Sequence, residues 1–220
     1  MYLIMFWLEM CLQKISNICK LVNIRPVENR IMNSMTYVLY NEGVSQCILI
    51  DCGEYDALKP VLEELGQKVK AVLLTHGHSD HIYGLKGLLA NQPFIEVYTN
   101  EYGHEELGNS RKNLSYYHEM PFTIDDYKQA IVNGGEILHF GGIGDIHVIA
   151  CPGHDPSCLS YQMDDVLFTG DAYIPGVKVF AKFPGSNRKQ AINSYILLQK
   201  MEVEGYKVYC GHHDYDEFVK

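Results

Sequence analysis

The chain has 220 residues, of which 47% are hydrophobic and 20% charged, a balance typical of a folded globular protein and not of a disordered one. Its formal net charge is -9 and it contains no basic tract, which argues against nucleic acid as the main partner. No segment has the length and apolar character of a membrane span, so no membrane partner is expected.

The cysteines and the N-terminus indicate a cytoplasmic protein. Seven cysteines without a C-x-x-C pair differ from a secreted disulfide framework and predict reduced thiols. The apolar start of the chain contains Glu9 and lacks the basic residues that open a signal peptide. Residues 1–17 are open to two interpretations, a poorly ordered extension or a buried first element. Residues 18–220 are predicted to form one domain, because no linker divides them.

The first half of the chain alternates strand and helix patterns. Two β-rich runs flank an Asn-Glu-Gly turn signal, which predicts a hairpin over residues 36–40 and 46–53. A helix is expected over residues 56–65, with Asp56 as its N-cap and Gly66 as its stop. The next predicted elements are a buried strand over 69–75, a helix over 81–90 and a strand over 94–99.

The second half is richer in strands. Residues 100–135 are polar and predict helix and loop at the rim of the molecule. The elements expected after them are four short strands over residues 136–140, 145–151, 158–163 and 166–170, a helix over 188–201 and a last strand over 207–211. Strand clusters with helices in both halves predict an α/β (α+β) fold, in which two sheets pack face to face and helices cover the outside.

The clearest chemical motif, HGHSDH, directly follows the predicted strand over residues 69–75. His76 and His78 alternate along the chain, so both imidazoles can point to one side of a tight turn. Asp80 and His81 open the next helix and can face the same space. Three imidazoles and a carboxylate suit Zn²⁺ or a similar borderline metal.

Three later strands end in turns that present a further candidate ligand. One ends in Pro-Gly-His154, another in Asp171 and the last in Gly-His212. Side chains at strand ends are held rigidly, as a metal site requires. Asp51, at the end of an earlier strand, is open to two interpretations. It is either a turn residue or a hydrogen-bond partner that fixes the tautomer of a ligand histidine.

Residues 36–213 resemble the metallo-β-lactamase superfamily. The resemblance is carried by the order, context and rough spacing of the segments HGHSDH, PGH, GD and GHH. Within that superfamily the chain is most similar to the branch of glyoxalase II and short hydroxyacylglutathione hydrolases. The resemblance implies an αββα sandwich of two mixed β-sheets flanked by helices. It also implies two divalent metal ions, with Zn²⁺ expected and iron or manganese as alternatives. The implied ligands are His76, His78 and His154 for the first metal, Asp80, His81 and His212 for the second, and Asp171 as a bridge.

The function that this resemblance implies is hydrolysis of a small-molecule ester, thioester or lactone. Two cations that share a water lower its pKa from about 15.7 towards roughly 7, which produces a bridging hydroxide. Asp80 and Asp171 are the predicted catalytic residues, and Asp80 would orient the hydroxide and carry a proton. The alternatives are a mononuclear-iron sulfur dioxygenase on the same fold, a phosphodiesterase of the tRNase Z type, and a regulatory protein without catalysis. Assembly into a homodimer is left open.

Overall fold

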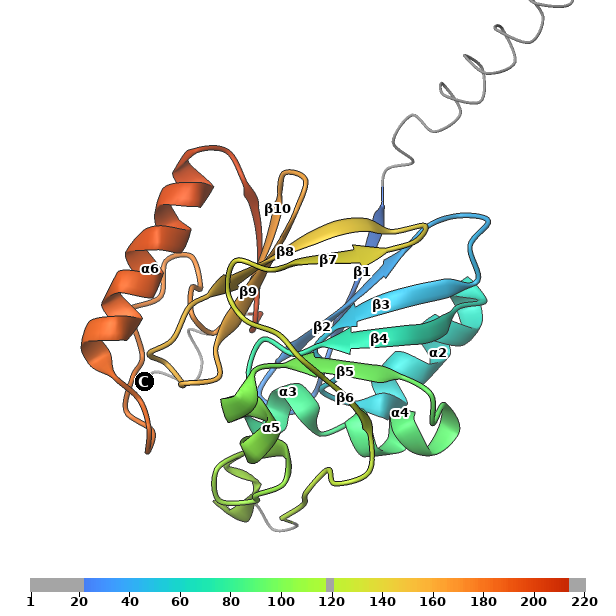
Figure 1. Cartoon of the computed structure of the whole chain (residues 1–220), viewed down its shortest axis with the longest axis horizontal. Helices are drawn as coiled ribbons and strands as arrows, with labels where there is room; N and C mark the ends of the chain where they lie inside the picture. Colours follow the sequence, from blue (N-terminus) through green and yellow to red (C-terminus); the bar gives the residue numbers. More distant parts are fainter. Residues whose placement is uncertain (1–21, 118–120, 214–220) are drawn as a thin grey trace, which may run out of the picture.

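The structure is a computed structural model that describes residues 22–117 and 121–213. The predicted extension over residues 1–17 lies outside the described residues. Two β-sheets face each other, and helices lie on the outer side of each sheet (Figure 1). Among the helices of the described part, none has the length and apolar character needed to cross a membrane.

The first sheet is built by the N-terminal half of the described chain. Its strands, in both spatial and sequence order, are β1 (Asn23–Glu28), β2 (Met35–Tyr40), β3 (Gln46–Ile50), β4 (Lys68–Leu73), β5 (Glu96–Thr99) and β6 (Lys128–Ile131). The predicted β2–β3 hairpin is confirmed as an antiparallel pair. From β3 to β6 the pairs are parallel, so the carboxyl ends of these strands meet at one edge.

The sequence patterns missed the two edge strands of this sheet. Strand β1 pairs only with β2 and carries Pro26, which cannot donate a ladder hydrogen bond and is tolerated at an edge. Strand β6 has a polar start, and its ladder partner is β5, at the opposite edge. Each of these strands has one neighbour in the sheet, and β-propensity depends on such packing, so their own composition signals them weakly.

The second sheet confirms the four short strands and the last strand that the sequence predicts. Its spatial order is β11-β10-β9-β8-β7, formed by β11 (Lys207–Cys210), β10 (Val166–Gly170), β9 (Leu159–Met163), β8 (Gly144–Ala150) and β7 (Ile137–Phe140). The pairs from β7 to β10 are antiparallel, whereas β10 and β11 are parallel because a helical crossover joins them.

The helices follow the predicted order, with two corrections. They are α2 (Tyr55–Leu65), α3 (Ser79–Ile82), α4 (Leu85–Asn91), α5 (Glu101–Leu107), the 3-10 helix η1 (Ser115–Tyr117) and α6 (Arg188–Val203). The prediction of Asp56 as the N-cap of α2 is wrong: Glu54 occupies that position without a side-chain cap, and Asp56 lies in the first turn. Gly66 ends α2 in the left-handed conformation, at φ 62°, as predicted.

The second correction concerns the single helix expected over residues 81–90. The structure divides it into α3 and α4, with Gly84 at the join. Here the chain passes so close to the start of α2 that a Cβ on Gly84 would lie 2.4 Å from the Tyr55 nitrogen. His81 lies in the short helix α3, before this join.

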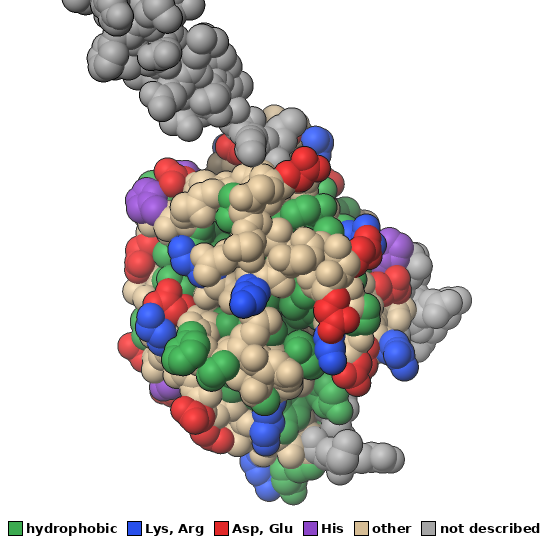
Figure 2. All heavy atoms as spheres, turned by 90° about the vertical axis from the view of Figure 1, so that its right-hand side faces the viewer, with side chains coloured by type: hydrophobic (Ala, Val, Ile, Leu, Met, Phe, Trp, Pro, Cys, Tyr) green, Lys and Arg blue, Asp and Glu red, His purple; other side chains and the backbone are tan. Residues whose placement is uncertain are grey.

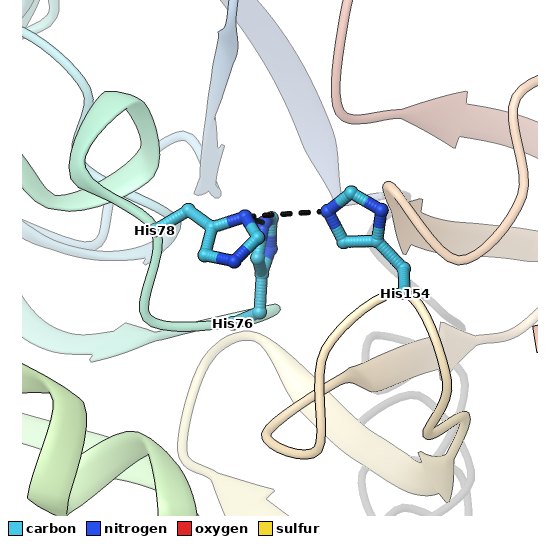
Figure 3. Close-up of side chains that lie close together, drawn as sticks. All are labelled: His76, His78 and His154. Carbon is cyan, nitrogen blue, oxygen red and sulfur yellow. Dashed lines mark hydrogen bonds between the residues drawn. The ribbon is translucent and has the colours of Figure 1, made fainter. Parts of the chain in front are cut away.

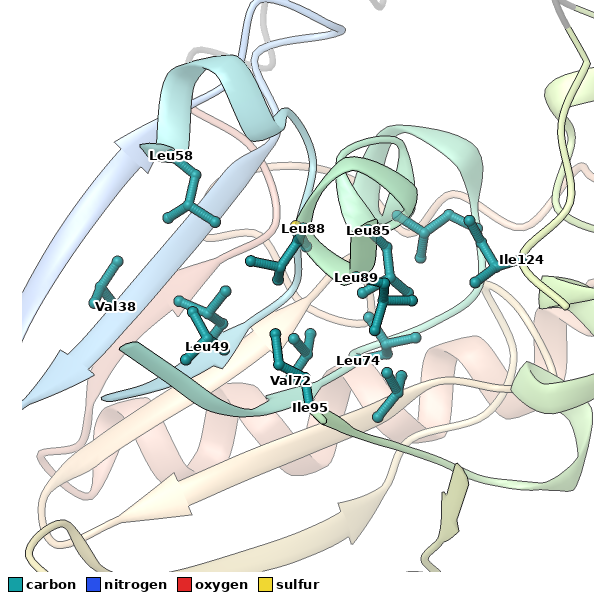
Figure 4. Close-up of a cluster of buried hydrophobic side chains, with 14 of the residues drawn as sticks. Val38, Leu49, Leu58, Val72, Leu74, Leu85, Leu88, Leu89, Ile95 and Ile124 are labelled. Carbon is teal, nitrogen blue, oxygen red and sulfur yellow. The ribbon is translucent and has the colours of Figure 1, made fainter. Parts of the chain in front are cut away.

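Buried hydrophobic side chains form one layer between the sheets and one under the helices of each outer face. On β3, Leu49 packs under α2 and α4 (Figure 4). Its neighbours Ile48 and Ile50 point to the other side, between the sheets. Strand β10 alternates in the same way, since Phe168 points between the sheets and Leu167 packs under α6. The central strands are therefore buried on both faces, and we expect this apolar core to hold the fold without a bound metal.

Candidate metal centre

Three histidines converge at the edge where β4 ends. The segment after β4 carries His76 and His78, and the turn after β8 carries His154 (Figure 3). The Nε2 atom of His76 lies 3.1 Å from Nδ1 of His78, and Nε2 of His154 lies 3.2 Å from the same Nδ1. All three rings are buried. Three ring nitrogens at this mutual distance present lone pairs to one point, as ligands of a cation do.

A second donor set adjoins the first. It contains Asp80 and His81 at the start of α3 and His212 after β11. Oδ2 of Asp80 lies 3.3 Å from Nε2 of His212 and 3.5 Å from Nε2 of His81. The candidate ligand atoms within each set lie within 4.8 Å of one another, so each set has the dimensions of a metal site.

Asp171 connects the two sets. Its Oδ2 lies 3.5 Å from Nε2 of His154 and 3.3 Å from Nε2 of His212, and its Oδ1 lies 3.4 Å from Nε2 of His81. Oδ1 is buried and lacks a hydrogen bond to any described residue. An unsatisfied carboxylate oxygen among imidazole nitrogens is costly unless a cation occupies the space. The structure thus brings all seven predicted ligands together, and the donor set fits the two-metal centre that the resemblance implies.

Hydrogen bonds behind the rings orient three of the histidines. Nδ1 of His81 lies 2.9 Å from Oδ2 of Asp51, Nδ1 of His154 lies 3.0 Å from the Phe180 carbonyl, and Nδ1 of His212 lies 2.8 Å from the Met32 carbonyl. With Nδ1 donating, each ring presents the lone pair of Nε2 to the centre. Asp51 therefore acts as a hydrogen-bond partner of a candidate ligand, the second of its two interpretations.

The two backbone partners were not predicted from the sequence. Met32 lies in a turn where it and Asn33 both adopt left-handed backbone, at φ 54° and 51°. This turn brings the Met32 carbonyl to His212, and the Asn33 carbonyl accepts a hydrogen bond from the nitrogen of His213. Every residue has a carbonyl, so no side-chain pattern could mark these two.

Charge is unevenly distributed in the metal-free cluster. Burial would lower the pKa of His212, but Asp171 and Asp80 outweigh burial and raise it to about 10. Burial likewise opposes the pKa shift of His81, yet Asp80 and Asp171 raise that pKa well above its usual value. By contrast, burial and the neighbouring imidazoles lower the pKa of His76 well below its usual value. In the metal-free centre, the carboxylates therefore favour protonation of the second donor set over the first.

Metal binding is accordingly expected to release one proton from His81 and one from His212. A protonated imidazole has no lone pair for a metal, so affinity should fall as the pH falls below the raised pKa values. Calorimetry of Zn²⁺ binding at pH 7.5, in buffers with different ionisation enthalpies, measures this release. A binding enthalpy that is independent of the buffer would contradict the prediction.

The fold and this centre together define a class of protein, an αββα sandwich with a buried His/Asp cluster at the strand ends of both sheets. The chain belongs to the metallo-beta-lactamase superfamily, whose family model matches residues 31–212. Solved structures with the same fold include the BLEG-1 B3 metallo-beta-lactamase, with a TM-score of 0.77 and 23% identity over 87% of this chain and 92% of that one. TTHA1623 in a di-iron-bound form has a TM-score of 0.70 and 22% identity over 86% and 92%.

Curated relatives carry the name hydroxyacylglutathione hydrolase. The protein of Psychromonas ingrahamii is 30% identical over 178 residues, which cover 79% of this chain and 59% of that protein. The protein of Buchnera aphidicola subsp. Schizaphis graminum is 28% identical over 144 residues, 66% of this chain and 49% of that protein. The chain spans about half the length of the curated relatives it matches.

Proposed function

We propose that this protein is a two-metal hydrolase that cleaves a small thioester, ester or lactone. The observation that carries the proposal is the pair of adjoining His/Asp donor sets joined through Asp171. A single metal would use only one set. The second set, with Asp80, His81 and His212, favours two ions over the mononuclear-iron alternative.

The donors favour zinc. Imidazole nitrogens and carboxylate oxygens suit Zn²⁺, and iron or manganese can occupy similar sites. His76, His78 and His154 would hold one ion, Asp80, His81 and His212 the other, and Asp171 would contact both. When bound, the two ions would polarise the scissile carbonyl and acidify a water.

Asp80 and Asp171 would each have a role in catalysis besides binding metal. Burial opposes the pKa shift of Asp80, but His81 and His212 lower that pKa to about 2, so its carboxylate is charged at neutral pH. A fixed anion accepts hydrogen bonds, and Asp80 would therefore orient the attacking water. Asp171 would hold the two donor sets at a constant separation, because its Oδ2 lies near both His154 and His212.

The centre borders a cavity of about 20 Å³, which has room for about one water molecule. Its lining combines site residues with apolar and basic side chains, among them His154, Asp171, Ile174, Lys178, Phe180 and Tyr195. Lys178 offers a positive charge for an anionic group of the substrate. On the face seen in Figure 2, which is turned away from the centre, basic and acidic side chains are interspersed.

The names of the relatives point to a thioester as the first substrate to test. Hydroxyacylglutathione hydrolases are named for that bond. The cytoplasmic location belongs to the same proposal, and the free thiols of the described cysteines agree with it. The homodimer stays a prediction.

Metal content and hydrolysis of the purified protein test the proposal together. We expect about two metal ions per chain after growth with zinc, and turnover of at least one substrate in a panel of acyl thioesters, esters and lactones. Removal of the metals by a chelator should abolish turnover, and Zn²⁺ should restore it. A protein that takes up no metal when zinc, iron and manganese are supplied would refute the proposal. Phosphodiesters and a thiol substrate with O₂ serve as probes for the alternatives.

A further inference from the structure

Two carboxyl groups outside the predicted ligand set lie behind the ring of His78. Asp155 follows His154 in the turn after β8, and Glu106 lies near the end of α5. Both residues are buried, at 3% and 5% exposure. Burying a carboxyl group destabilises a fold unless hydrogen bonds or opposite charges compensate the lost hydration. The presence of two such groups beside a candidate ligand therefore suggests that they act on that ligand.

Asp155 contacts His78, whose outward nitrogen has no backbone or hydroxyl partner among the described residues, whereas Nδ1 of His76 lies 3.1 Å from the Thr75 hydroxyl. His78 turns Nδ1 to the centre, toward His76 and His154. Its other nitrogen, Nε2, lies 3.3 Å from Oδ2 of Asp155. The second oxygen of Asp155 accepts hydrogen bonds from the backbone nitrogen of Ser157 at 2.7 Å and from its hydroxyl at 2.6 Å. Ser157 thus fixes Oδ1 of Asp155, and Oδ2 faces the ring of His78.

Glu106 supports this arrangement from α5. Its carboxyl group neighbours that of Asp155 and lies against Gly77, where a Cβ would be 2.2 Å from Oε2 of Glu106. The glycine between His76 and His78 therefore leaves room for the Glu106 carboxyl group. Burial, and then the Asp155 carboxylate, raise the pKa of Glu106 to about 9. A neutral Glu106 can donate its proton to Asp155 without adding a second charge.

We propose that Asp155, supported by Glu106, is a positioning residue that accepts the Nε2 proton of His78 and thereby directs the Nδ1 lone pair to the first metal. The inference rests on the metal centre proposed above. It gives His78 the partner that Asp51, Phe180 and Met32 provide for the other rings. A carboxylate behind an imidazole also makes the ring a stronger ligand. Asp155 and Glu106 make no direct contact with the proposed metals.

The affinity of the full-length protein for Zn²⁺ alone, measured by competition with a chromogenic chelator at pH 7.5, tests this role. We expect Asp155→Asn to weaken binding at the first site about 10- to 100-fold, because an amide is a weaker acceptor for the His78 proton. The matched control is Asp145→Asn, which removes a carboxylate 2.7 Å from the exposed ring of His139, outside the centre. The control should bind Zn²⁺ as the wild type does. Circular dichroism and the melting temperature report on folding.

Two outcomes would overturn the inference in different ways. If the wild type binds two Zn²⁺ and Asp155→Asn binds them equally well, the positioning role is wrong and the proposed function stands. If the wild type binds no Zn²⁺, both fail.

Should Asp155→Asn not fold, Glu106→Gln and Glu106→Leu replace it. Glutamine can still donate to Asp155 and should keep the wild-type affinity, whereas leucine cannot donate and should weaken binding several-fold. Equal affinities in both variants and the wild type would overturn the inference.

Discussion

Replacement of Asp171 by asparagine is expected to lower turnover by about 100-fold or more, while the fold is retained. Asp171 contacts His154 of one donor set and His81 and His212 of the other. Asparagine keeps the shape of the side chain but removes the negative charge that would be shared by two cations. We therefore expect the second metal to bind less tightly. The measurements are turnover, metal content per chain and melting temperature.

A matched surface variant controls for the loss of one charge. Asp165 lies just before β10, is exposed and pairs with Lys207 at 3.6 Å. Asp165→Asn should leave both turnover and metal content unchanged, because an exposed ion pair contributes little. If Asp171 merely capped a turn, Asp171→Asn would cost about 1 kcal/mol of stability and little activity. Normal turnover with two bound metals would exclude Asp171 from the site.

Replacement of Asp51 by alanine is expected to reduce the free energy of unfolding by about 3–5 kcal/mol. Its carboxylate accepts hydrogen bonds from the nitrogen and the hydroxyl of Thr75, both at 2.7 Å, and from Nδ1 of His81 at 2.9 Å. Alanine would leave these buried donors unpaired. It would also have to adopt the left-handed conformation of Asp51, at φ 58°, which costs about 1–2 kcal/mol. Denaturant unfolding of the metal-free protein measures the loss.

Asp51→Asn separates folding from the orientation of His81. An amide oxygen can still accept from Thr75, so the stability should stay close to that of the wild type. The amide nitrogen would then donate to Nδ1 of His81 and move the ring proton to Nε2, the atom that faces the centre. We expect the affinity for the second Zn²⁺ to fall about 10- to 100-fold. Equal stability of wild type and Asp51→Ala, or unchanged Zn²⁺ affinity in Asp51→Asn, would show that Asp51 has no such role.

Much of the candidate site could be predicted from the sequence, because its ligands are attached to local structure. Four of the seven lie within the six residues of HGHSDH, where short-range geometry alone brings them together. The other three directly follow predicted strands, and strand ends in two packed sheets meet at a common edge. The central strands were predictable for a similar reason, since burial on both faces requires continuous apolar runs.

The partners behind the ligands could not be predicted in this way. Asp155 stands next to His154 in the sequence, yet only the packing of α5 brings Glu106 to it. The Met32 carbonyl reaches His212 across 180 positions of the chain. Such contacts depend on the position of a backbone segment that is distant in the sequence. Neither residue type nor spacing predicts that position.

The sequence by itself therefore determined the class of fold, the central strands and the chemical identity of the ligands, because periodic burial and donor atoms are properties of individual segments. Only the tertiary structure decided which ring nitrogen of each histidine faces the centre, and which edge strands complete the first sheet. A ring nitrogen is selected by the acceptor at its other side, and an edge strand by the neighbour that offers it hydrogen bonds. The acceptors behind the rings of His154 and His212 lie far from them in the chain, and each edge strand depends on a partner outside its own segment.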